Sequence, residues 1–220
     1  MMSFRFPPII VVMIAALAVL AAFAATSETT PGDAWLAERL QSIHNGTFAD
    51  VLNKTSDFAT HPLLTLMIVI GALAALYVGG LRAAIMAAIL PILRFIVPLA
   101  KEAFERPRPP LAISHHLTDF SFPSGHAFNA TLVYGMFFYL ASVYIKPAWA
   151  RLLVQAGCLW VIVGTGLQRI YIGAHWPSDV AGGMLLAGLV LAGGIAIHRW
   201  SIAPGRGQAP ATGGRKYEAL

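Results

Sequence analysis

Long apolar stretches set the strongest limit on the fold of this chain. A helix needs roughly 17 to 25 residues to cross about 30 Å of hydrocarbon, and six stretches have a suitable length. None of them alternates apolar with polar residues, as the strands of a membrane barrel would. We therefore expect an all-α integral membrane protein, a bundle of six transmembrane helices. The expected spans are Ile9–Ala25, Leu63–Gly80, Ala83–Ala100, Ser124–Ile145, Leu152–Gln168 and Val180–Trp200.

The composition excludes a soluble globule. Charged residues are 11% of the 220 residues and hydrophobic residues are 57%, whereas about 25% of an ordinary globular chain is charged. The net charge of +5 is spread over termini and short loops, which argues against nucleic acid as a partner. The single cysteine, Cys158, excludes a disulfide within the chain.

The segments outside the spans are few. The first span resembles a signal peptide, but it is long for one and precedes further spans, so we expect it to remain. Residues 26–62 predict either an amphipathic surface helix between spans one and two or a loop with one helical turn. We expect one domain over residues 1–200 and a disordered cytoplasmic tail over residues 201–220, which is rich in glycine.

The distribution of basic residues predicts the orientation. With the N-terminus inside, the inner segments hold eight Lys and Arg residues and one acid. The outer segments hold six basic residues and nine of the ten acids. Because inner segments carry the excess of Lys and Arg, we expect both termini in the cytoplasm.

Three groups of polar residues adjoin the spans, where polar side chains are costly and need a reason. In the predicted topology all three face the outer side, so we expect them to converge there. Taken singly, each has an ordinary explanation, such as a helix cap or a membrane-border cation. The groups are Lys101 with Arg108, the string Pro123-Ser124-Gly125-His126, and Arg169 with His175 and Asp179.

Together these residue types predict a phosphate site. Lysine and arginine supply cations, and the arginine fork matches phosphate oxygens. Ser124 and Gly125 stand at a helix start, where free N–H groups favour an anion. Asp179 lies one turn past His175 and can hold one imidazole nitrogen, which leaves the other to attack phosphorus. His126 remains as the acid for the departing oxygen.

The three groups resemble the tripartite signature of the type 2 phosphatidic acid phosphatase family of integral membrane lipid phosphatases. The resemblance runs from Lys101 to Asp179 and implies a phosphohistidine mechanism without a metal or other cofactor. It implies His175 as the nucleophile, Asp179 as its orienting partner and His126 as the general acid. The groups implied to bind phosphoryl oxygens are Lys101, Arg108, Ser124, Gly125 and Arg169.

Some polar residues leave alternatives open. The family usually has serine where this chain has Gln168, whose amide can still donate a hydrogen bond. Arg94 lies nearly two turns deeper than Lys101 on the third span, and either extends the positive field beneath the site or is paired inside the bundle. We assign no metal to the adjacent His115 and His116, which we interpret as loop residues.

The resemblance implies a hydrolase of lipid phosphates or diphosphates in a bacterial cytoplasmic (inner) membrane, with its site on the outer face. Undecaprenyl diphosphate is the first expected substrate, since its recycling requires an outward-facing site. Phosphatidylglycerophosphate, phosphatidic acid and lipid A are alternative substrates. A lipid phosphotransferase using the same phosphohistidine and a non-catalytic binder of anionic lipids are the alternative functions.

Overall fold

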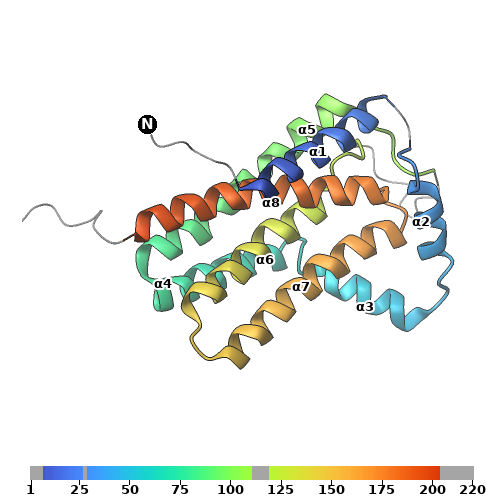
Figure 1. Cartoon of the computed structure of the whole chain (residues 1–220). Coiled ribbons are helices and arrows are strands. Elements are labelled where there is room, and N and C mark those ends of the chain that lie inside the picture. Colours follow the sequence, from blue (N-terminus) through green and yellow to red (C-terminus); the bar gives the residue numbers. More distant parts are fainter. Residues whose placement is uncertain (1–6, 27–28, 111–118, 204–220) are drawn as a thin grey trace, which may run out of the picture.

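The computed structural model describes residues 7–26, 29–110 and 119–203, and these ranges contain helices and no strand (Figure 1). The long helices lie roughly along one direction, and the shorter helices Asp33–Gln41 and Gly46–Asp57 lie at one end of the bundle. In chain order they are α1 (Pro8–Thr26), α2 (Asp33–Gln41), α3 (Gly46–Asp57), α4 (Leu63–Ile89), the 3₁₀ helix η1 (Leu90–Phe95), α5 (Ile96–Phe104), α6 (Gly125–Tyr144), α7 (Ala148–Tyr171) and α8 (Pro177–Ile202).

Five segments of the described chain are long and apolar enough to cross a membrane. They confirm the expected all-α membrane architecture, although length and composition do not confirm the expected number of six. Two of the expected spans fall in one continuous stretch of helix. The five segments are Pro8–Thr26, Leu63–Phe104, Gly125–Tyr144, Ala148–Tyr171 and Pro177–Ile202.

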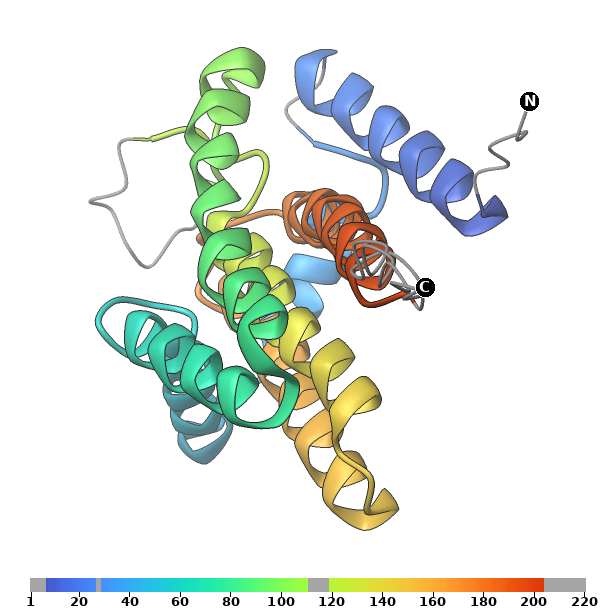
Figure 2. The ribbon, with the colours of Figure 1, turned by 90° about the vertical axis from the view of Figure 1, so that its left-hand side faces the viewer.

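The segment Leu63–Phe104 is not one straight helix. Its 42 residues would measure about 63 Å as a single rod, roughly twice the thickness of the hydrocarbon layer. Gly80 interrupts it with φ 73° and ψ −168°, a conformation that glycine adopts at little cost. Nη1 of Arg94 lies 3.0 Å from Nε2 of His61, so the second arm returns to where the first began (Figure 2).

Helix α6 occupies the centre of the bundle. Ala127, Phe128 and Met136 on this helix are fully buried, and it packs against α4, α7 and α8. A methyl group on Gly183 of α8 would lie 2.5 Å from the carbonyl oxygen of Ser124, so only glycine permits this approach of the two helices. The second and third polar groups of the sequence are thereby brought together.

The polar segment between the first two spans forms two helices. A helix, α2, is present where an amphipathic surface helix was expected; in it Ala37 is buried and Trp35 is 63% exposed. A second helix, α3, starts at the N-cap Asn45, whose side chain accepts a hydrogen bond from Phe48 N, and it packs against α7. The expected tail lies largely outside the described residues, which end at residue 203.

Candidate active site

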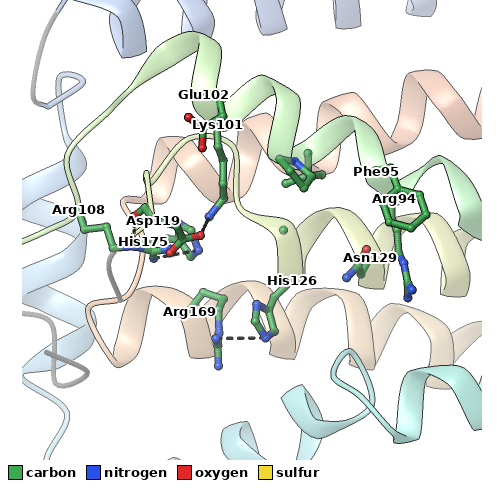
Figure 3. A pocket seen from close by; sticks show the side chains of 13 residues that line it. Arg94, Phe95, Lys101, Glu102, Arg108, Asp119, His126, Asn129, Arg169 and His175 are labelled. Atoms are coloured by element: carbon green, nitrogen blue, oxygen red, sulfur yellow. Dashed lines mark hydrogen bonds and ion pairs between the residues drawn. The ribbon is translucent and has the colours of Figure 1, made fainter. Parts of the chain in front are cut away.

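Most of the expected site residues line one pocket of about 420 Å³. The pocket lies where α5 ends and α6 begins, beside the connection from α7 to α8 (Figure 3). The sequence-predicted residues among its lining are Lys101, Arg108, Gly125, His126, Arg169 and His175. Lys101 and His175, more than seventy positions apart, thus line the same cavity. The spacing of the motifs along the chain does not by itself show this proximity.

Asp119 bridges two of the cations and was not expected from the sequence. Its carboxylate forms ion pairs with Lys101 and, at 2.6 Å, with Nη2 of Arg108. Partial burial acts to raise the pKa of Asp119, but hydrogen bonds from Lys101 and Arg108 outweigh it and lower the pKa to about 2. The carboxylate therefore stays charged at neutral pH and is the ion-pair partner of both cationic side chains.

The third cation, Arg169, is held by its neighbour. Its Nε donates a hydrogen bond of 2.6 Å to Oε1 of Gln168. The amide nitrogen of Gln168 in turn donates to Oδ1 of Asn53 on α3 at 2.9 Å. Gln168 is buried and does not line the pocket, so its amide orients Arg169 from behind.

His175 faces the pocket with one nitrogen and a carboxylate with the other. Its Nδ1 lies 3.6 Å from Oδ2 of Asp179, and its Nε2 lies 3.4 Å from Nη1 of Arg108. Burial lowers the pKa of His175 below 6.5, although the neighbouring Asp179 acts to raise it. A neutral imidazole has an unprotonated ring nitrogen, which is the chemical requirement for a nucleophile.

Asp179 is itself fixed by several donors. It accepts hydrogen bonds from the backbone nitrogen of Trp176 at 2.9 Å and from the hydroxyl of Ser121. Nη1 of Arg106 donates to its Oδ1 at 2.6 Å. The carboxylate is completely buried, so these donors replace the water that would otherwise solvate it.

Arg106 connects Asp179 with the first residue of α2. Its Nη2 lies 2.8 Å from Oδ2 of Asp33, and its guanidinium also donates to Ser178 at 2.7 Å. Glu105, in the left-handed conformation with φ 46°, ends α5 just before Arg106. The sequence-based reasoning missed Arg106 and Asp33, although an arginine two positions before Arg108 was a visible signal.

The opening of α6 positions His126 and uses Ser124 differently from the expectation. Ser124 is buried outside the pocket lining, and its side chain caps α6 by accepting from Ala127 N. Its backbone nitrogen donates to Asp179 O at 3.0 Å. Nε2 of His126 lies 3.4 Å from Nη1 of Arg169, so His126 stands beside a cation at the pocket wall.

No group of three or more His, Cys, Asp and Glu residues in the described ranges could hold a metal ion. The loop residues His115 and His116 lie outside those ranges. The side chains that line the pocket include four Lys and Arg residues and two carboxylates, so cations are in excess and a negatively charged ligand matches them.

A family model described as the PAP2 superfamily matches residues 79–203, more than half of the chain, including the four Lys and Arg residues and both histidines that line the pocket. The chain belongs to the PAP2 superfamily. The family expected from the three polar groups is thus confirmed, and the relatives below support the expected lipid phosphate hydrolase.

Two curated relatives resemble this PAP2 protein. It is 35% identical over 132 residues to phosphatidylglycerophosphatase B of Bacillus subtilis (strain 168), covering 59% of this chain and 64% of the relative. It is 38% identical over 76 residues to the putative undecaprenyl-diphosphatase YbjG of Escherichia coli (strain K12), covering 34% of this chain and 33% of the relative. The matches thus span less than two thirds of either relative.

A crystal structure resembles the PAP2 protein over more of its length. It is that of a transmembrane PAP2 type phosphatidylglycerolphosphate phosphatase from Bacillus subtilis, with a TM-score of 0.74 and 25% identity. The superposition covers 90% of this chain and 98% of that one. Together with the apolar helices, this likeness identifies the PAP2 protein as an integral membrane protein.

Proposed function

We propose that this protein hydrolyses lipid phosphates through a covalent phosphohistidine. The observation that carries the proposal is the pocket itself, where His126 and His175 share a cavity with Lys101, Arg108 and Arg169. A binding protein would need the cations but not a histidine backed by a buried carboxylate. The family and the names of the relatives support the same activity.

In the first step Nε2 of His175 attacks phosphorus while the bond to the lipid oxygen breaks. The cations bind the equatorial phosphoryl oxygens, where charge is spread during the transfer. Asp179 holds Nδ1 of His175 and stabilises the positive charge that develops on the ring. His126 gives its proton to the departing lipid oxygen.

In the second step His126 takes a proton from water, and the resulting nucleophile attacks the phosphohistidine. The bond between phosphorus and Nε2 breaks, and inorganic phosphate leaves with the added oxygen. His175 returns to the neutral form and His126 regains the proton that it gave up. The cycle consumes one water for each phosphate released.

Two lipid substrates have support. Undecaprenyl diphosphate is the substrate expected from the sequence, and it appears in the name of the relative with the shorter alignment. Phosphatidylglycerophosphate is supported by the longer alignment and by the crystal structure. We place the site at the outer face of a bacterial cytoplasmic membrane, on the strength of the distribution of Lys and Arg.

The test is phosphate release by the detergent-purified full-length protein. The panel contains undecaprenyl diphosphate, phosphatidylglycerophosphate, phosphatidic acid and lipid A, each measured with chelator present. We expect chelator-resistant release that His175→Ala lowers by more than about 10³-fold and His126→Ala by about 10² to 10⁴-fold. A folded His175→Ala protein that turns over near the wild-type rate would remove the nucleophile from this proposal.

The same assay separates the alternative functions. Phosphate that appears on an added lipid acceptor and not in solution would identify a phosphotransferase. A folded protein that binds the lipids but releases and transfers nothing would be a non-catalytic binder.

A further inference from the structure

Arg94 lines the pocket at a distance from the cations already described. It lies in η1, seven residues before Lys101, which corresponds to roughly 10 Å along a helix. In Figure 3 His126 lies between the group around His175 and the pair formed by Arg94 and Asn129. The pocket therefore extends past His126 to a fourth cationic side chain, that of Arg94.

The charge of Arg94 has no carboxylate partner among the described residues. Its guanidinium contacts Nε2 of His61 at 3.0 Å and stacks on the ring of Phe95, 5.5 Å from the centroid. Neither group neutralises a cation. Because a charge within a membrane-spanning segment is costly, an unbalanced arginine facing a cavity indicates a negatively charged ligand.

Asn129 offers a second polar group at the same end of the pocket. It follows His126 by three residues on α6, so both side chains lie on one face of the helix. Its amide makes no hydrogen bond to any residue in the described ranges, although the side chain is only partly exposed. An amide and a guanidinium together can bind phosphate oxygens.

The geometry points to a second phosphate subsite formed by Arg94 and Asn129 on the leaving-group side of the pocket. This inference rests on the proposed function, because His126 marks the leaving-group side only if it protonates the departing oxygen. The scissile phosphoryl group lies against Lys101 and Arg108, and the lipid oxygen faces His126. The part of the leaving group that follows this oxygen then lies beside Arg94.

The subsite selects lipids whose leaving group bears its own phosphate. In a lipid diphosphate the second phosphate follows directly through the bridging oxygen. In phosphatidylglycerophosphate it follows after a glycerol unit. Phosphatidic acid has no second phosphate, so its diacylglycerol leaving group gains nothing from Arg94. Undecaprenyl diphosphate and phosphatidylglycerophosphate both carry a second phosphate on the leaving group. The subsite therefore favours both of these lipids over phosphatidic acid.

The test compares kcat/KM for the three lipids in the same detergent with wild type and Arg94→Ala. We expect Arg94→Ala to lower kcat/KM by about tenfold or more for both lipids with two phosphates, chiefly through KM. Phosphatidic acid should change by less than about threefold. Arg94→Lys should restore part of the loss, because it keeps the charge without the planar fork.

His61→Ala is the matched control, since it removes the hydrogen-bond partner of Arg94 and leaves the guanidinium in place. It should leave the ratio of the three kcat/KM values unchanged. An equal loss for all three lipids in both variants would show that Arg94 only tethers the start of α4, and would overturn the subsite. Unchanged kinetics in Arg94→Ala would overturn it as well.

Binding measurements separate failure of the subsite from failure of the proposed function. If the wild type hydrolyses none of the lipids, the proposed function fails, and direct binding of the same three lipids to wild type and Arg94→Ala decides the subsite. A preference for two-phosphate lipids that Arg94→Ala loses would support it. Equal binding of all three lipids by both proteins would refute it.

Discussion

Arg106 and Asp179 form an ion pair in which neither side chain is exposed to solvent, with Nη1 of Arg106 2.6 Å from Oδ1 of Asp179. The same guanidinium reaches Asp33 through its other terminal nitrogen. One arginine therefore joins the carboxylate behind His175 to the N-terminal end of α2. Only a planar fork with separate donors can bridge two carboxylates in this way.

Replacing Arg106 should destabilise the protein as well as lower its activity. Arg106→Ala leaves two buried carboxylates without their cation, and we expect the free energy of unfolding to fall by about 3–5 kcal/mol. Unfolding in detergent, followed by helical circular dichroism, measures this change. Asp33→Asn is the control, because it leaves the ion pair between Arg106 and Asp179 in place. It should retain more activity than Arg106→Lys, because lysine lacks the planar fork that reaches both carboxylates. An Arg106→Ala protein with wild-type stability would contradict the prediction.

Removing the carboxylate of Asp119 should strengthen phosphate binding. Asp119→Asn frees Lys101 and Arg108 from an internal anion, so we expect KM and the inhibition constant for inorganic phosphate to fall by about threefold or more. Glu102→Gln, also at the pocket rim but without an ion pair to these cations in the described residues, is the matched control. A higher KM in Asp119→Asn would mean that the carboxylate holds the cations in place.

The effect of the Asp119 carboxylate on phosphate inhibition should persist at mildly acidic pH. Its pKa is about 2, below the ordinary 3.8, so the stability from its ion pairs is present above pH 3.8 and is lost as pH falls through about 2. We therefore expect the difference in phosphate inhibition between wild type and Asp119→Asn to stay constant from pH 5 to pH 8. A difference that disappears toward pH 5 would contradict the low pKa.

The acidic limb of the pH profile should reflect His175. Burial lowers the pKa of His175 below 6.5 and Asp179 acts to raise it, so the neutral nucleophile persists below pH 6.5 and is lost as pH falls through the lowered pKa. In Asp179→Asn we expect a slower reaction whose acidic limb lies at lower pH than in wild type. The ionisation of the substrate is common to both proteins. A limb that moves to higher pH would refute this assignment.

The orientation can be tested with single cysteines in a Cys158→Ala background. Thr47→Cys precedes the second expected span, and Ala148→Cys is at the first residue of α7, next to the connection from α6; both positions are exposed. An impermeant thiol reagent should label Thr47→Cys in intact cells and Ala148→Cys only after the membrane is opened. Labelling of both from the same side would overturn the predicted topology.

Local sequence patterns were sufficient to predict most of the helices. The lengths of the apolar stretches predicted the helices, and the expected break between spans two and three falls beside Gly80. The spacing of Lys101, Arg108, His126 and His175 from the span ends predicted one shared site, and all four line the pocket. Such features follow from the sequence because helix length and helix register depend on neighbouring residues.

The partners of the charged groups were decided by the tertiary structure. Arg106 pairs with Asp33 and Asp179, each 73 positions away, Asp119 occupies Lys101 and Arg108, and Ser124 caps α6 without lining the pocket. A sequence identifies which residues carry charge, but an ion pair depends on distance and burial. Those quantities exist only once packing contacts such as that of Gly183 against Ser124 have brought the helices together.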